Sequence, residues 1–400
     1  MPVLNPFWHG TPIRPEEFIG REYELYQITG RILTGQSTAI TGSPRCGKTS
    51  VLEYLKSPAK QPALYEEDAE KLIFSYLDAY NWSSESGPLQ FWETALRPLS
   101  TESTLSQAYQ DCKDNQFVEY ALEKLITQIK DTNKRLVLMV DGFHAILGSP
   151  SQHWDAVFFG SMRTLVSRSG GALVLIITLN GPLSDFQKAV QELTRSKSPY
   201  FNFIYEVRLG ALADEVINSL LIKGIKVDER FNETDFELIK NIAGGHPYLL
   251  QVAASMRWEM GTRLKSPAEF IGKFYYQVED VLNEIWQSWS GSLQEAFISV
   301  ALLQLDEFKG IFKKKLQINI EELSHGLPVF KSDLEYLKQY GFLIEDEKVL
   351  GNWKVKPQIF LPFALLNFKR EYRSKLSEVF NYLFIPRYHE KYKFPFFKFG

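Results

Sequence analysis

The segment that most constrains this chain is residues 37–50, STAITGSPRCGKTS, in which a short apolar stretch runs into a glycine-rich loop. Gly42 and Gly47 frame the loop in the spacing G-x-x-x-x-G-K-T. In this spacing the glycines let backbone N–H groups curl around phosphate oxygens, Lys48 supplies a positive charge, and the Thr49 hydroxyl can ligate Mg²⁺. The flanking apolar residues predict a strand before the loop and a helix after it, and the N-terminal end of that helix also attracts phosphate. The sequence therefore predicts a phosphate-binding loop made of Gly42, Ser43, Pro44, Arg45, Cys46, Gly47, Lys48, Thr49 and Ser50.

Continuous apolar runs predict the strands of a sheet around this loop. Such runs are typical of a parallel sheet that is covered on both faces. Helical patterns separate the runs, which indicates an α/β domain of the P-loop NTPase type over residues 1–210. Ahead of the loop, Pro15 is expected to open a helix with Leu25, Ile28 and Leu33 on its apolar side. Besides the strand that ends near Ile40, the predicted strands are residues 72–79, 135–140, 172–179 and 203–209.

The strand pattern stops after Ala211, and helical patterns follow. We expect a helical lid domain over residues 211–290, with helices at 214–222, 233–242, 248–260 and 281–289. Residues 291–380 predict a winged-helix-like domain, because two helices, 294–303 and 331–340, precede two short strand patterns at 342–345 and 353–355. The last segment, residues 381–400, is a tail rich in aromatic and basic residues.

A phosphate loop is completed by an aspartate at the end of another core strand. Asp141 ends the run 135–140, so it is expected to hold Mg²⁺ together with Thr49, and Lys48 and Asp141 are the predicted catalytic residues. The next residue is Gly142, where a carboxylate that orients the attacking water is usual. This predicts slow hydrolysis, which Gly142→Glu would raise if the site is otherwise complete. His144 is either a substitute for that carboxylate or an ordinary residue at the edge of a strand.

Polar residues at the end of the fourth predicted strand are candidates for sensing a γ-phosphate. Thr178 and Asn180 stand there, although Asn180 also suits the turn before Gly181-Pro182. Arg163 and Arg168 either neutralise phosphate charge or belong to the solvated surface.

Several motifs, taken in their order along the chain, resemble those of the STAND-type ATPases, relatives of the archaeal ATPase family within the broader AAA+ group. The resemblance covers roughly residues 5–260, with a weaker similarity in the winged-helix segment. The residues that carry it are Asn5-Pro6-Phe7, Phe18-Ile19-Gly20-Arg21-Glu22, the loop 42–50, Asp141 and the segment 244–251, GGHPYLLQ.

This resemblance implies further site residues and a function. It implies that Phe18 and Ile19 help form the adenine pocket and that Pro247 touches the nucleotide from the lid. It also implies ATP and Mg²⁺ as ligands, with ATP and ADP states that differ in shape. Members of the family typically act as molecular switches in signalling, programmed cell death or antiviral conflict. No effector domain is evident in these residues, which favours a protein partner or self-assembly.

Composition and charge limit the other classes of partner. The formal net charge is -3, which gives no whole-chain case for nucleic acid or an anionic membrane. The longest apolar run, residues 172–179, is far below the roughly 20 residues that span a bilayer, so no membrane partner is expected. The two cysteines, Cys46 and Cys112, fit a reducing cytoplasm, where we place the protein.

Two alternatives to the switch remain. The first is a DNA-binding ATPase that uses the winged helix, supported by the basic cluster Lys313-Lys314-Lys315. The expected recognition helix, residues 331–340, carries Asp333 and Glu335 and no arginine, so DNA is not the favoured partner. The second alternative is a degenerate, nucleotide-stabilised scaffold whose aromatic tail docks a partner protein.

Overall fold

The computed structural model describes residues 4–82, 86–148, 154–227, 231–261, 266–304 and 324–367 of the 400-residue chain. The chain divides into two compact units. The sheet unit consists of Pro12–Gly42 and Gly47–Leu209, and the helical unit consists of Met1–Thr11, Ser43–Cys46 and Gly210–Gly400.

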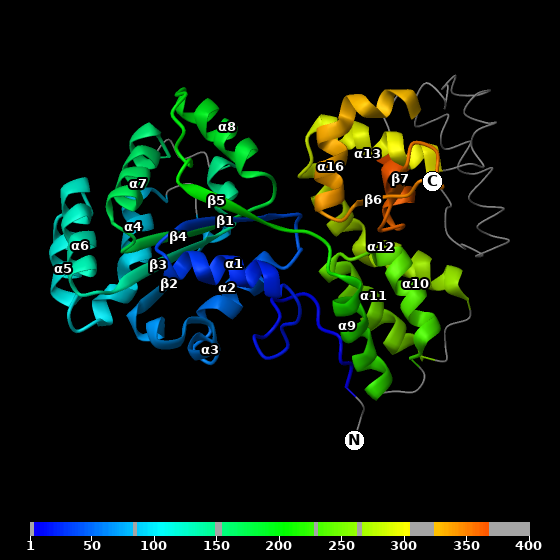
Figure 1. Ribbon diagram of the computed structural model, residues 1–400, viewed down its shortest axis with the longest axis horizontal. Helices are drawn as coiled ribbons and strands as arrows, with labels where there is room; N and C mark the ends of the chain where they lie inside the picture. Colours follow the sequence, from blue (N-terminus) through cyan, green and yellow to red (C-terminus); the bar gives the residue numbers. More distant parts are fainter. Residues whose placement is uncertain are drawn as a thin grey trace. The chain divides into compact units, whose positions relative to one another are not determined.

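The sheet unit is built on a five-stranded parallel sheet with the strand order β2-β3-β4-β1-β5 (Figure 1). All residues of β1 and β4, and all but the first of β3, are buried, as the unbroken apolar runs predicted. The predicted α/β fold with a parallel sheet is therefore confirmed. The strands are β1 Ser37–Gly42, β2 Leu72–Asp78, β3 Arg135–Asp141, β4 Leu173–Leu179 and β5 Ile204–Leu209.

The register of the sheet brings the ends of β1, β2, β3 and β4 to one edge. Strand β4 lies between β1 and β3, with Thr41 opposite Leu179 and Val140 opposite Ile177. On the other side of β3, Asp78 of β2 lies opposite Asp141. Because the strands are parallel, the residues that follow them meet at this carboxyl edge of the sheet.

Helices cover both faces of the sheet. Helices α1 and α2 lie on one face, and α7 and α8 lie on the other (Figure 1). Beyond β3, Phe143 is fully buried, with its ring 5.4 Å from that of Phe186 and 6.3 Å from that of Phe201. This packing fixes the chain just after Asp141. The helices are α1 Glu22–Leu33, α2 Lys48–Lys56, α3 Gln61–Tyr65, α4 Pro88–Leu96, α5 Ser106–Asp114, α6 Glu119–Asp131, α7 Ala156–Arg168 and α8 Leu183–Thr194.

The first helix begins later than the sequence predicted. Helix α1 begins at Glu22 and not at Pro15, because Gly20 and Arg21 adopt left-handed backbone conformations with φ of 72° and 68°. A right-handed helix cannot continue through such residues. The expected apolar side is present, with Leu25 and Ile28 buried.

The helical unit contains the helices that were predicted for the lid. Helix α12 is much longer than the predicted segment 281–289, because it begins at Pro267. Its start is fixed by the Ser266 hydroxyl, which accepts a hydrogen bond from the Glu269 N–H at 3.2 Å, as a helix cap does. The elements are α9 Asp214–Val227, α10 Glu233–Ala243, α11 Pro247–Met260, α12 Pro267–Gln287, α13 Gly291–Gln304, α16 Lys331–Gln339, β6 Leu343–Glu345, β7 Trp353–Val355 and α17 Phe360–Asn367.

A helix followed by a two-stranded antiparallel sheet stands where the wing was predicted. Strands β6 and β7 pair with Leu343 opposite Val355. Residues 305–323, which include Lys313-Lys314-Lys315, lie outside the described residues, as does the tail 381–400. The winged helix therefore stays a prediction. In the part of the chain that the structure describes, no helix has the length and apolar character needed to cross a membrane.

Candidate functional site

A glycine-rich loop connects β1 with α2 of the sheet unit. Gly42 ends β1, and Gly47 precedes α2 with φ of 102°, a conformation that side chains with a Cβ rarely adopt. Lys48 begins the helix and is only 8% exposed, and its Nζ donates a hydrogen bond to the Gly42 carbonyl oxygen at 3.0 Å. A buried ammonium at the N-terminal end of a helix makes this position electropositive, which suits an anionic ligand.

Asp141 lies next to the loop at the carboxyl edge of the sheet. Its Oδ2 accepts hydrogen bonds from the Thr49 hydroxyl at 2.6 Å and from the Tyr76 hydroxyl at 3.1 Å. Its Oδ1 accepts one from the Thr178 hydroxyl at 2.5 Å. Burial, together with the neighbouring Asp141 carboxylate, raises the pKa of Tyr76, so this phenol stays protonated. The structure thus brings together the two residues that were predicted as Mg²⁺ ligands.

The donor set of this pair fits Mg²⁺. Thr49 and Asp141 offer hard oxygen atoms within hydrogen-bond distance of each other. Among the described residues, no group of three or more His, Cys, Asp or Glu side chains could hold a metal by itself. Mg²⁺ commonly binds through one or two protein oxygens together with the phosphates of a substrate, and the pair is suited to that mode.

Thr178 connects Asp141 with the residue after it. The Thr178 hydroxyl donates to Asp141 and accepts a hydrogen bond from the Gly142 N–H at 2.7 Å. This bond helps hold Gly142 in its left-handed conformation, with φ of 65°. The turn after β3 is therefore fixed from the neighbouring strand β4.

A tyrosine lies against Gly142. A Cβ atom added at Gly142 would lie 2.3 Å from Cε2 of Tyr80, and the three nearest atoms all belong to that ring. The Tyr80 hydroxyl is 2.9 Å from Nε2 of His144 and accepts a hydrogen bond from the Asn180 amide at 3.3 Å. Burial, followed by the positive charge of Lys48, lowers the pKa of His144 to about 4, so its imidazole is neutral at pH 7. Tyr80, His144 and Asn180 therefore lie together beside Gly142.

The sequence pointed to His144 and Asn180 but not to Tyr80. Tyr80 follows β2, in the short 3-10 helix Ala79–Asn81, and belongs to no motif. The one available signal was its position just past the end of a predicted core strand, where polar side chains of parallel sheets gather.

The segment ahead of α1 packs on the helix that follows the loop. The Phe18 ring lies 4.7 Å from the Tyr54 ring of α2, and the Ser50 hydroxyl accepts a hydrogen bond from the Ile13 N–H at 3.2 Å. Phe18 and Ile19 are both half-buried. Their role at an adenine ring stays a prediction.

The tip of the loop, Ser43–Cys46, belongs to the helical unit. Within that unit the Pro44 carbonyl oxygen is 3.1 Å from Nε2 of His246. Nδ1 of the same ring accepts from the Leu249 N–H at 3.5 Å, so Nε2 carries the proton and donates to Pro44. His246 is the cap of α11, and Pro247 is the first residue of that helix. The predicted residues Pro44 and Pro247 are thus linked through His246.

The other two residues of the tip differ in exposure. Arg45 is exposed and adopts φ of 58°. Its Nε lies 3.1 Å from a carboxylate oxygen of Glu284, and its guanidinium lies 5.1 Å from the centre of the Tyr248 ring. Cys46 is buried, and its N–H donates to the Ser43 carbonyl oxygen at 3.2 Å. Arg45 is therefore oriented by its neighbours in the helical unit.

The two arginines of α7 have contacts of an ordinary surface kind. Arg168 is largely exposed and pairs with Glu123 at 3.2 Å. Arg163 approaches the Ser198 hydroxyl at 3.4 Å. These contacts favour the surface interpretation for both.

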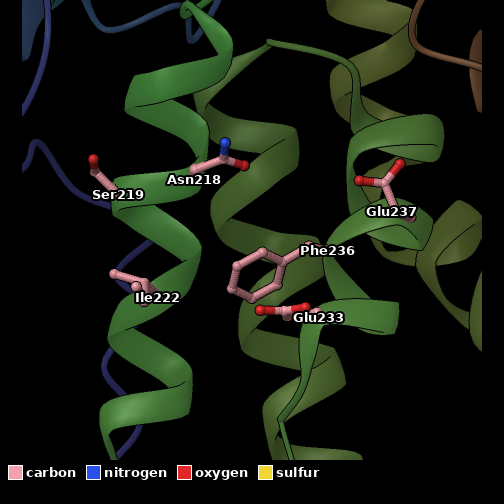
Figure 2. Close-up of a pocket in the computed structure, with 6 residues that line it drawn as sticks. All are labelled: Asn218, Ser219, Ile222, Glu233, Phe236 and Glu237. Carbon is pink, nitrogen blue, oxygen red and sulfur yellow. The ribbon is translucent and has the colours of Figure 1, made fainter.

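A separate groove of about 500 Å³ lies between α9 and α10 (Figure 2). None of the predicted site residues lines it. Two carboxylates and two apolar side chains share its wall with two small polar ones, and this mixture suggests no particular chemistry. The lining residues are Asn218, Ser219, Ile222, Glu233, Phe236 and Glu237.

Comparison with known proteins bears on the fold. A scan against known protein families and a search of curated proteins find no match to this chain. Among solved structures, the chain is similar to a Walker-type ATPase of Pyrococcus abyssi, with a TM-score of 0.53 and 16% identity over 90% of this chain and 99% of that one. It also matches the ORC2 protein of Aeropyrum pernix in its ADPNP-ADP complexes, with a TM-score of 0.48 and 16% identity over 89% and 96% of the two chains. Drosophila ORC bound to DNA gives a TM-score of 0.44 and 12% identity over 88% of each chain.

The first of these similarities supports a conclusion about fold. The other two TM-scores lie below 0.5. The strand order, the loop between β1 and α2 and the similarity to the Pyrococcus protein agree. The chain has a P-loop α/β fold similar to that of the Pyrococcus Walker-type ATPase.

Proposed function

We propose that this protein binds ATP with Mg²⁺, hydrolyses it slowly and acts as a nucleotide-dependent switch in signalling or cellular conflict. The observation that carries the proposal is the direct contact between Thr49 and Asp141, 2.6 Å apart, beside the buried Lys48. These three side chains come from two separate segments of the chain. Their meeting at the carboxyl edge of a parallel sheet is the arrangement that phosphate binding requires.

Each residue has a role in this proposal. Lys48 attracts the phosphates, and the Thr49 hydroxyl and the Asp141 carboxylate hold Mg²⁺, which neutralises phosphate charge when it is bound. Gly47 lets the backbone approach the phosphates closely. The position after Asp141 offers no carboxylate, so no strong base is in place to activate water, and hydrolysis is slow.

A switch needs ATP and ADP to stabilise different states. Moving a two-state equilibrium from 1:99 to 99:1 takes about 5.5 kcal/mol of differential binding. A γ-phosphate with Mg²⁺, held by several charged groups, can supply free energy of this size. The output would be binding of a partner protein or assembly of several copies.

The first test measures nucleotide affinity. Lys48→Ala removes a charge about 4 Å from a phosphate, which is worth about 4 kcal/mol near a protein surface, or about 1000-fold in Kd. The binding of a fluorescent ATP analogue is titrated with and without Mg²⁺. Lys188→Ala, at an exposed lysine of α8, is the matched control and should bind like the wild type. Unchanged affinity in Lys48→Ala would exclude the proposed site.

The second test concerns the switch itself. Mass and shape in solution are measured with ATP and Mg²⁺ and then with ADP, together with the rate of hydrolysis. A change of mass or shape with ATP at little turnover supports the switch. An unchanged monomer in both states contradicts it and favours the scaffold.

The DNA alternative receives little support from α16. Asp333 accepts a hydrogen bond from the Ser292 hydroxyl at 2.6 Å, and Lys338 pairs with Glu345 at 2.8 Å. A helix with carboxylates on it and a lysine already paired is poorly suited to phosphate contacts. Titration with labelled duplex DNA at low salt tests this, and tight salt-dependent binding would favour the DNA-binding ATPase over the switch.

A further inference from the structure

The position that lacks a carboxylate is filled by another side chain. The Tyr80 ring lies over Gly142 so closely that a Cβ there would come within 2.3 Å of it. Gly142 also has φ of 65°, which disfavours any residue with a side chain. The surrounding structure therefore disfavours a carboxylate side chain at this position. Gly142→Glu alone would displace Tyr80 rather than complete the site.

The Tyr80 hydroxyl has two hydrogen-bond partners in the site. Its oxygen accepts from the Asn180 amide at 3.3 Å, and it shares a hydrogen bond with Nε2 of His144 at 2.9 Å. Burial and the charge of Lys48 lower the pKa of His144, so its imidazole is neutral, and the ring nitrogen that carries the proton sets the direction of this second bond. The Asn180 amide has two N–H donors. One of them bonds to Tyr80, and the second is the one that a γ-phosphate could accept from.

We propose that Tyr80 is a positioning residue that holds the Asn180 amide for a γ-phosphate while its ring keeps a catalytic carboxylate out of the site. This inference rests on the proposed function, because it concerns the same nucleotide site. A site of this kind distinguishes ATP from ADP and has no strong base with which to consume the ATP. Recognition of the third phosphate is thereby separated from its removal.

The direct test compares ATP with ADP. Tyr80→Phe keeps the ring over Gly142 and removes the hydroxyl that orients Asn180. We expect the affinity for the ATP analogue to fall about tenfold, the usual effect of one hydrogen bond to a charged group, while the affinity for the ADP analogue is unchanged. Tyr120→Phe, at an exposed tyrosine of α6, is the control. Equal losses for both nucleotides, or no loss for either, would overturn the inference.

A second measurement needs no nucleotide. Gly142→Ala is expected to lower the midpoint of thermal unfolding, because the new methyl group collides with Tyr80 and the backbone is left-handed. In a Tyr80→Ala background the collision is removed, so Gly142→Ala should lower the midpoint by less than half as much. Equal shifts in the two backgrounds would mean that Tyr80 does not close this position.

These measurements distinguish a failure of the proposed function from a failure of the proposed role of Tyr80. If the wild-type protein binds neither ATP nor ADP, the proposed function fails, whatever the variants do. If the wild type binds both and Tyr80→Phe behaves like it, only the role of Tyr80 fails.

Discussion

The two sides of the proposed nucleotide site differ in how closely they follow the usual pattern of phosphate-binding proteins. On the holding side, Lys48, Thr49 and Asp141 have the expected types, spacing and contacts. On the turnover side, Gly142 replaces a carboxylate and Tyr80 occupies the space. Under the proposed function, binding a nucleotide and hydrolysing it depend on separate residues, so one side can change while the other stays complete.

The largest expected effect that would sharpen this comparison lies on the turnover side. It is a pH dependence of the free energy of unfolding that comes from His144. His144 has a pKa of about 4 in the folded protein, below its ordinary value of 6.5. Between these two values the unfolded chain binds a proton that the folded protein does not. The free energy of unfolding should therefore be highest above pH 6.5 and fall by about 3 kcal/mol as the pH falls to 4.

Chemical denaturation of the nucleotide-free protein between pH 4 and 7.5 measures this dependence. His144→Gln places an amide where Nε2 bonded to Tyr80 and does not titrate. It should lose this part of the pH dependence and keep the part that comes from carboxylates. The same slope in both proteins would show that His144 is not held neutral, and the turnover side would then resemble an ordinary acid–base site.

A smaller effect tests the residue that joins the two sides. Thr178→Val keeps the volume of the side chain and removes the hydroxyl that bonds both Asp141 and the Gly142 N–H. Leaving a buried N–H without its acceptor should cost about 2 kcal/mol of stability, measured by denaturant unfolding. Thr127→Val, at a surface position of α6, is the control. A stability like that of the wild type would mean that the two sides are held independently.

The smallest effect comes from the holding side. Asp141→Asn keeps the shape of the side chain and removes its charge, so Mg²⁺ should improve ATP binding about tenfold less than in the wild type. Affinity without Mg²⁺ should not fall. The measurement is the ratio of Kd values with and without Mg²⁺, and Asp131→Asn, at an exposed position at the end of α6, is the control. An unchanged ratio would remove Asp141 from the proposed metal site.

The sequence predicted the sheet and the holding side because both depend on local patterns. The central strands β1, β3 and β4 are buried on both faces, and in β4 this leaves an unbroken apolar run. The loop has a fixed spacing of glycines, lysine and threonine. Asp141 could be assigned because it ends one of these runs.

The features that the sequence did not predict depend on particular backbone conformations or on contacts between distant segments. Helix α5 was missed because it is mostly polar and buries only Tyr109 and Cys112. The start of α1 was misplaced because nothing local marks Arg21 as left-handed. Tyr80 reaches Gly142 only because β2 pairs with β3 in a register that sets Asp78 beside Asp141, and a register of this kind is not encoded in any short motif.

The order of the strands also has a consequence for the synthesis of the chain. Strand β1, which leads into the phosphate loop, lies between β4 and β5. Both partners are made much later, on the order of ten seconds after β1 at ordinary rates of translation. Until Leu173–Leu179 leaves the ribosome, β1 has neither of its neighbours to pair with. The proposed phosphate loop would therefore gain its neighbouring strands only late in synthesis.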